Sequence, residues 1–291
     1  MLGGGKNGFW GAWYQVPSRG AGQEFVIRRY RAHCRDLTSA NSLKMRRVHP
    51  YSIAAWRKPG HTESMTNFFA PADRADDWQK LLAKPELHWK TGYSAKSLAY
   101  CWTEAKGFPA EVALALNTST SLELHNLEFL LGFPEYDVDL PGGKRPSQND
   151  VFVLARNQNG TASIAVEGKV SESFDLPIGQ RFANPTSGQT ERLNYLCELL
   201  QLQRDSIEHI GYQLLHRSAS ALIEAERFGA NRAIMLIHSF SRSLEHFDDY
   251  ANFCSLYSMA ASPNQVSHAA RIKDIDFYLG WIVGEPEYLQ R

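Results

Sequence analysis

The chain has 291 residues, of which 43% are hydrophobic and 21% are charged. This length suits one large domain or two small ones, and the composition excludes collagen-like, low-complexity and wholly disordered chains. No apolar run reaches the roughly 18 residues that cross a bilayer, and no hydrophobic signal core opens the chain, so we expect a cytoplasmic protein. The four cysteines are far apart and form no C-x-x-C pair, which disfavours a structural zinc site.

The net charge of zero conceals an uneven distribution of charge. Residues 1–64 hold eleven Lys and Arg against three acidic residues, a net charge of +8, so residues 65–291 carry −8. We therefore expect a basic N-terminal extension, 1–64, followed by a single domain, 65–291. The extension fits an arm that neutralises phosphates, an organelle-targeting leader, or sequence upstream of a functional start at Met65, and the sequence leaves these alternatives open.

Helices are predicted in the first part of the domain. An acidic stretch over 76–82 is typical of a helix, and Ser94 is placed to cap a second one. The apolar positions of this second helix recur with helical spacing at Leu98, Cys101, Trp102 and Ala105. A third helix is predicted over 122–131, where Gly132 and Pro134 end it.

A meander of three strands is predicted next. Residues 135–140 and 151–155 have strand composition, with a Pro-Gly-Gly turn at 141–143, and an Asn-Gly turn leads into a third strand over 161–170. Successive side chains of a strand alternate between its faces. Glu167 and Lys169 must therefore point to the same face of the third strand.

Asp150 opens the second strand, so it can lie beside Glu167 and Lys169 of the neighbouring strand. Carboxylate oxygens are the ligands that Mg²⁺ prefers, and a lysine beside them can orient or deprotonate a water or pair with a phosphate. The pattern thus indicates a metal-dependent phosphodiesterase. The alternative is an exposed ion pair between Glu167 and Lys169, with Asp150 as a turn residue.

Two segments carry a family resemblance: SQNDVFVL at 147–154 and IAVEGK at 164–169. They resemble the PD-(D/E)xK, or restriction-endonuclease-like, nuclease superfamily, in which an acidic residue opens the second core strand and ExK lies on the third. The resemblance implies a nuclease in which Asp150 and Glu167 bind Mg²⁺ or Mn²⁺ and Lys169 is the catalytic lysine. Asn149 stands where the superfamily's name has proline, a position that is loose in it.

Residues 68–281 also resemble, more narrowly, a family of uncharacterised bacterial proteins related to that superfamily. Four stretches carry this likeness: LPGG at 140–143, VEGK at 166–169, YQLLHR at 212–217 and IHSF at 237–240. A nucleic-acid partner is implied, DNA in preference to RNA, and the oligomeric state, a homodimer included, stays open. The acidic domain favours the alternative of a catalytically silent module that binds nucleic acid or protein, because duplex binding normally needs a basic surface.

The remaining elements agree with a restriction-endonuclease-like core. Ser187 is placed to cap a helix, a longer helix is predicted over 205–228, and the apolar run 232–237 predicts a buried strand, parallel to its partner because a helical crossover precedes it. The order α-β-β-β-α-β is that of the superfamily's core: an α/β fold with a mixed central sheet flanked by helices, here with extra N-terminal helices. A further helix over 247–257 and an apolar tail near Trp281 follow.

Further candidate residues lie on the predicted helices. Glu128, or less favourably Glu123, could add a third carboxylate to the metal, although exposed helix glutamates are the default. Gln213 and Arg217 share a helix face, and related nucleases place such residues beside the active site, so we expect a catalytic Gln213 and substrate binding by Arg217. The alternative is a loop hydrogen bond for Gln213 and a surface ion pair for Arg217.

Three features complete the expectations from the sequence. Gln148, next to the acidic position, is expected to bind substrate. His238 lies in an apolar strand end and is expected to be a buried, hydrogen-bonded histidine. Zinc hydrolysis and nucleotide cofactors are not indicated, because the chain has no H-x-x-x-H or H-E-x-x-H motif, Walker loop or dinucleotide fingerprint.

Overall fold

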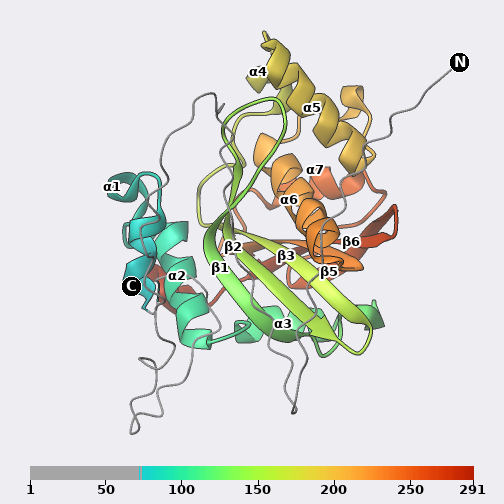
Figure 1. The fold of residues 1–291 in the computed structure, drawn as a ribbon. Helices are drawn as coiled ribbons and strands as arrows, with labels where there is room; N and C mark the ends of the chain where they lie inside the picture. The colour runs from blue at the N-terminus through green and yellow to red at the C-terminus, as the bar shows by residue number, and fades with distance from the viewer. Residues whose placement is uncertain (1–71, 73) are drawn as a thin grey trace, which may run out of the picture. The chain divides into compact units, whose positions relative to one another are not determined.

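The structure is a computed structural model that describes Ala72 and residues 74–291. Six strands form one mixed sheet in the order β1-β2-β3-β4-β6-β5 (Figure 1). β3 pairs in parallel with β4, and β4 with β6, while the other neighbouring pairs are antiparallel. The strands are β1 Glu128–Val138, β2 Ser147–Asn157, β3 Gly160–Lys169, β4 Arg232–Ser239, β5 Gln265–Ile272 and β6 Ile275–Val283. The domain therefore has the predicted α/β class.

Helices cover both faces of this sheet and enclose two hydrophobic cores. The α-helices are α1 Pro85–His88, α2 Ser94–Ala105, α3 Ala110–Asn117, α4 Ile178–Arg181, α5 Ser187–Leu200, α6 Tyr212–Phe228 and α7 Phe247–Ser255. Short 3₁₀ helices are η2 Ala75–Leu81, η3 Leu122–Leu124, η4 Arg204–Ser206 and η5 Pro286–Gln290. In the described part of the chain, no helix is long and apolar enough to cross a membrane.

β3 lies in the middle of the fold and is buried on both faces. Ile164 and Val166 pack into the core formed with α2, and Ala165 packs into the core formed with α6. Glu167 and Lys169 follow the alternation of Ala165 and point toward α6, because both contact side chains of that helix. The predicted meander and the predicted parallel pairing of 232–237 are both confirmed.

The helix predicted over 122–131 is wrong. Only Leu122–Leu124 is helical, as a 3₁₀ turn, and β1 already begins at Glu128. The apolar run that includes Phe129 and Leu131 pairs with β2 instead. A short apolar run fits a buried strand as well as a helix, so the tertiary pairing decided between them.

Other boundaries also differ from the expectations. The helix predicted over 205–228 starts only at Tyr212, after η4 and a turn, with Gly211 as its N-cap. The apolar tail near Trp281 is strand β6, which forms a hairpin with β5. This hairpin was not predicted, because its first strand is part-exposed and carries a weak apolar pattern.

The helix caps lie one residue from the predicted positions. Thr186, not Ser187, caps α5: its hydroxyl accepts the N–H of Gln189, whose side chain accepts the N–H of Thr186 in return. Tyr93 is the N-cap of α2. Ser94 instead donates both its backbone N–H and its hydroxyl to Glu172.

The predicted extension 1–64 lies outside the described residues, as does Cys34. Cys101, Cys197 and Cys254 are buried free thiols. All the elements above thus belong to the predicted domain 65–291.

Candidate active site

Three neighbouring strands bring three carboxylates to one level of the sheet. Val151 of β2 pairs with Val166 of β3, so Asp150 and Glu167 are the next residues along this antiparallel ladder. Glu135 of β1 lies between two residues that pair with Val151 and Asn149, which places it across from Asp150. The predicted convergence of Asp150 and Glu167 is thus present, and Glu135 joins it.

Lys169 completes this cluster. Its ammonium donates to Oε1 of Glu167 at 2.7 Å and to Oε1 of Gln213 at 2.8 Å, so Gln213 reaches the site as predicted. Glu167 and Lys169 are each only 3% exposed. This burial contradicts the alternative of a solvated ion pair on an exposed strand face.

Arg217 lies one turn after Gln213 on α6, and it is buried. Its Nε donates to Oε2 of Glu167, and its Nη1 donates to the Ser147 hydroxyl at 3.0 Å. This burial contradicts the alternative of a surface ion pair for Arg217: the guanidinium is an internal counter-charge of the carboxylates. Substrate binding by Arg217 stays a prediction. The sequence left this alternative open because it cannot show which helix face a crossover docks against the sheet.

The charges of the cluster shift the pKa values of its carboxyls in opposite directions. Burial acts to raise the pKa of Glu167, but Arg217 and Lys169 outweigh it and hold this pKa below its ordinary value. Burial and the charge of Glu167 raise the pKa of Asp150 to about 7. Loss of solvent around the carboxyl, with the charge of Asp150, raises the pKa of Glu135 well above its usual range. The cluster thus has three carboxyl groups but only two positively charged side chains, Lys169 and Arg217. Binding of a further cation would therefore be favourable there.

Glu135 is not among the site residues predicted from the sequence, where it is only the first residue of the predicted strand 135–140. Its φ of 50° is left-handed, a conformation that costs a non-glycine residue of the order of 1 kcal/mol and is enriched at functional sites. A sequence signal existed: a hairpin centred on Gly142 and Gly143 places Glu135 directly opposite Asp150.

The structure does not bring Glu128 into the cluster. Glu128 opens β1, seven residues before Glu135, and forms an exposed ion pair with Arg156 at 3.2 Å. Glu123 lies in η3, also outside the cluster. Both glutamates were expected on the predicted helix 122–131, but the structure has the short 3₁₀ helix η3 and the start of strand β1 there instead. Gln148 is part-exposed and lies across from Asp137, two residues before Asp150.

The donor set fits a hard divalent cation. Oδ2 of Asp150 accepts the N–H of Gly168 at 2.7 Å, and within the described chain its other oxygen has no hydrogen-bond partner. Glu135 likewise has no described hydrogen bond or ion pair. These oxygens, with the free lone pairs of Glu167, are ligands of the kind that Mg²⁺ and Mn²⁺ take, together with water.

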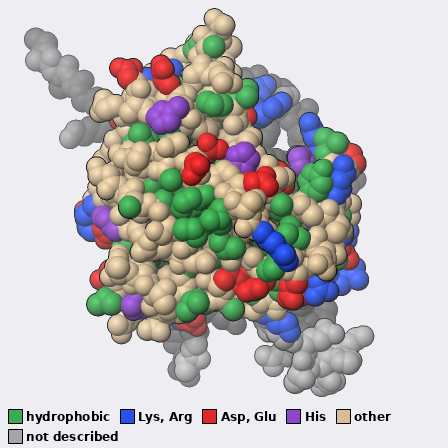
Figure 2. Space-filling model, turned by 180° about the vertical axis from the view of Figure 1, so that it is seen from behind, with side chains coloured by type: hydrophobic (Ala, Val, Ile, Leu, Met, Phe, Trp, Pro, Cys, Tyr) green, Lys and Arg blue, Asp and Glu red, His purple; other side chains and the backbone are tan. Residues whose placement is uncertain are grey.

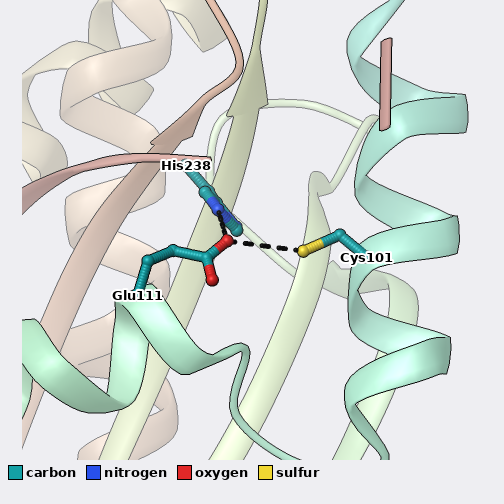
Figure 3. Close-up of side chains that lie close together, drawn as sticks. All are labelled: Cys101, Glu111 and His238. Atoms are coloured by element: carbon teal, nitrogen blue, oxygen red, sulfur yellow. Dashed lines mark hydrogen bonds and ion pairs between the residues drawn. The ribbon is translucent and has the colours of Figure 1, made fainter. Parts of the chain in front are cut away.

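A second cluster has ligand atoms close enough to hold a metal ion: Cys101 of α2, Glu111 of α3 and His238 of β4. Figure 3 shows the three side chains pointing toward one another. Oε1 of Glu111 lies 3.0 Å from Nε2 of His238 and 3.6 Å from Sγ of Cys101. The cluster lies apart from the carboxylates, since it contacts α2 and α3 rather than α6.

The hydrogen bonds of this cluster oppose a metal. The indole N–H of Trp102 donates to Nδ1 of His238 at 3.0 Å, and an indole N–H can only donate. Nδ1 of His238 therefore carries no proton, so Nε2 carries it and donates to Glu111. A metal on Nε2 would displace that proton and leave two hydrogen-bond donors facing each other at Nδ1. As expected from the sequence, His238 is a buried histidine with both nitrogens hydrogen-bonded.

The comparisons with known proteins give one match. Residues 71–286 match the model of a family described as a domain of unknown function (DUF6946), a span that contains all six strands and the whole carboxylate cluster. Searches among curated proteins and among solved structures give no match. Since the match covers well over half of the chain, the protein belongs to the DUF6946 family.

Proposed function

We propose that this protein is a metal-dependent nuclease on a restriction-endonuclease-like core. The observation that carries the proposal is the meeting of Glu135, Asp150 and Glu167 on three adjacent strands, with the Lys169 ammonium held against Glu167. The order of helix, three-stranded meander, crossover helix and parallel strand is the order that the superfamily uses, and it supports the same assignment.

The reaction is hydrolysis of a phosphodiester: water adds to phosphorus, one P–O ester bond breaks, and the departing oxygen takes up a proton. Glu135, Asp150 and Glu167 would hold Mg²⁺ or Mn²⁺. The bound ion would lower the pKa of a coordinated water and stabilise the charge that develops at phosphorus.

In this proposal Lys169 is the catalytic group. Two of its three N–H donors are held by Glu167 and Gln213, and the ammonium also lies 5.0 Å from the centre of the Phe174 ring. Among the described residues the third N–H has no hydrogen-bond acceptor, so it would donate to the attacking water or to a phosphate oxygen. Gln213 is a positioning residue in this scheme, because it acts through the ammonium. Arg217 keeps Glu167 ionised, since its charge lowers the pKa of that carboxyl.

The test is an assay of the full chain on single- and double-stranded DNA and RNA with Mg²⁺ or Mn²⁺. We expect cleavage by the wild type, and a loss of roughly a hundredfold or more in Lys169→Met, because the variant lacks a group that stabilises transition-state charge. Methionine keeps most of the buried volume of the lysine. The matched control is Lys84→Met, at an exposed lysine on another part of the domain, which should cut like the wild type.

Thermal unfolding of each variant separates loss of activity from loss of the fold. A wild type that cuts none of the four substrates, or a folded Lys169→Met that cuts equally well, would contradict the proposal. Either result would favour the alternative of a silent binding module on the same fold.

A further inference from the structure

A pocket of about 500 Å³ lies next to the carboxylate cluster. Its walls come from the loop between β1 and β2, the loop after β3, and helices α4, α5 and α6, which lie together at one end of the sheet (Figure 1). Gln213 belongs to both places: it lines the pocket, and its Oε1 accepts the Lys169 ammonium at 2.8 Å. Whatever fills the pocket therefore lies one side chain away from the catalytic lysine.

The pocket is basic although the domain is acidic. Three arginines line it: Arg145, Arg181 and Arg192. Of the two acidic residues in its wall, Asp175 pairs with Arg181 at 2.7 Å. Glu172 is ionised but pairs with none of the arginines, because its oxygens accept from Ser94 and from the backbone N–H groups of residues 170 and 171. Two arginines therefore lack a carboxylate partner.

Arg192 is held in place by the loop between β1 and β2. Its Nε donates to the carbonyl of Pro141 at 2.9 Å, and its Nη2 donates to the carbonyl of Leu140 at 3.2 Å. This leaves Nη1 without a described partner. The guanidinium is thus fixed without being neutralised, which is the arrangement that binds anions with little loss of side-chain entropy.

The glycines of the LPGG stretch make this arrangement possible. Gly142 has a φ of +73°, and a Cβ there would lie 2.1 Å from the carbonyl oxygen of Gly188 in α5. The loop can reach α5, and so Arg192, only because this position has no side chain.

Arg145 lies in the same loop and is exposed, and among the described residues it has no ion pair or side-chain hydrogen bond. His216, also in the wall, adds no charge, because burial and the charge of Arg217 hold its pKa well below the ordinary value. Three arginines against Asp175 and the ionised Glu172 leave the pocket a net charge of +1 (3 − 2). The arginines without an ion pair among the described residues are Arg145, in the loop between β1 and β2, and Arg192 of α5.

We infer that this pocket binds the terminal phosphate monoester of a nucleic-acid strand and so directs cleavage to strand ends. The inference rests on the proposed nuclease function. The volume suits one nucleotide-sized group rather than a continuous duplex. A terminal phosphate carries close to two negative charges near pH 7, against one for an internal diester, so two arginines without an ion pair attract it more strongly than the diester.

The test measures binding in EDTA, so that no cleavage occurs. Short single strands of one sequence, with a 5′-phosphate, a 3′-phosphate or only hydroxyl ends, are titrated with the full chain by fluorescence anisotropy. We expect one phosphorylated strand to bind roughly tenfold more tightly than the hydroxyl strand, because charge-assisted hydrogen bonds to arginine are worth that much. Because the basic residues 1–64 are present in every titration, the pocket variants below, and not the comparison of strands alone, assign the preference to the pocket.

The variants locate the preference. Arg145→Gln should abolish the preference for the phosphorylated strand without loss of the fold, because the side chain is exposed and has no described partner. Arg192→Gln should abolish this preference as well. Arg156→Gln, at an exposed arginine that pairs with Glu128 at the far end of β2, is the matched control and should keep it. Equal affinity for phosphate and hydroxyl ends, or a preference that Arg145→Gln keeps, would overturn the inference.

A cleavage arm separates this inference from the proposed function. With Mn²⁺, linear strands should be cut from the phosphorylated end and circular single strands should resist. If circles are cut as fast as linear strands, the end-directed inference fails while the nuclease proposal stands. If phosphate ends bind but no strand is cut, the nuclease proposal fails and only the phosphate pocket remains.

Discussion

Single residues decide which carboxylates of the cluster have a positively charged partner. Glu167 contacts both Lys169 and Arg217, whereas Glu135 and one oxygen of Asp150 have no cation of their own in the described chain. Replacing one partner of a buried ion pair leaves a buried charge unmatched. Variants that keep the shape of the side chain are therefore the informative ones here.

Glu135 gives the sharpest test at this scale. In Glu135→Gln we expect the affinity for Mn²⁺, measured by titration calorimetry, to fall roughly tenfold or more, because a hard ligand is lost while the volume is kept. Glu128→Gln is the control, since Glu128 was a candidate by sequence but lies at the other end of β1. Equal heats from wild type and Glu135→Gln would remove Glu135 from the site. If an Asp150→Asn, Glu167→Gln double variant gave the same heats of Mn²⁺ binding as the wild type, the proposed metal site would be contradicted as a whole.

At the scale of elements, the pleat and the turns could be predicted from the sequence. The alternation of Ile164 and Val166 with Glu167 and Lys169 already fixes which side chains share a face of β3. The partners of that face depend on contacts far apart in the chain: Arg217 arrives on α6, fifty residues after Glu167. Local pattern contains no information about that docking, so the sequence could not decide between a place for Arg217 at the site and a surface ion pair.

Glu172 links two elements and provides a pH test. It accepts the N–H of Ser94 at the start of α2 and N–H groups after β3, and although burial acts to raise its pKa, these bonds hold the pKa below the ordinary value. A carboxyl with a lowered pKa stabilises the fold above the unfolded-state value, near pH 4.5, and this contribution is lost as the pH falls through the folded pKa.

We therefore expect Glu172→Gln to lower the free energy of unfolding by about 1 to 2 kcal/mol at pH 7, and by less at pH 4. Urea unfolding at the two pH values measures the difference. Glu128→Gln, which alters an exposed pair, should cost at most about 0.5 kcal/mol at either pH. A loss in Glu172→Gln that is the same at both pH values would mean that the charge of Glu172 is not what stabilises this junction.

At the scale of the whole molecule, the domain is acidic outside its pocket. On the face seen from behind, acidic and hydrophobic side chains occupy much of the middle, and Lys and Arg do not gather into a stripe (Figure 2). A duplex that ran across this face would meet no continuous basic surface. The proposed recognition of one strand end would need only the basic pocket, and it would reconcile the proposed nuclease function with a net charge of −8 over 65–291.

The boundary of the domain gives a prediction at the same scale. All six strands and both cores lie within 72–291, and the family match begins at residue 71. We expect a chain that starts at Met65 to unfold cooperatively, with a thermal midpoint within roughly 2 °C of the full chain, a shift that corresponds to less than about 1 kcal/mol. Loss of cooperative unfolding in calorimetry would show that the boundary lies nearer the N-terminus.

The strands that carry the carboxylates also determine when the site forms. Glu135, Asp150 and Glu167 belong to a local meander, which can form early because its contacts are close in the chain. Arg217 reaches them only when α6 docks to the sheet. Before α6 docks, the three acidic groups lie on adjacent strands, and Lys169 is the positively charged side chain next to them. The docking of α6 is therefore favoured by charge as well as by apolar burial, and the step that completes the core also supplies the second counter-charge of the carboxylate cluster.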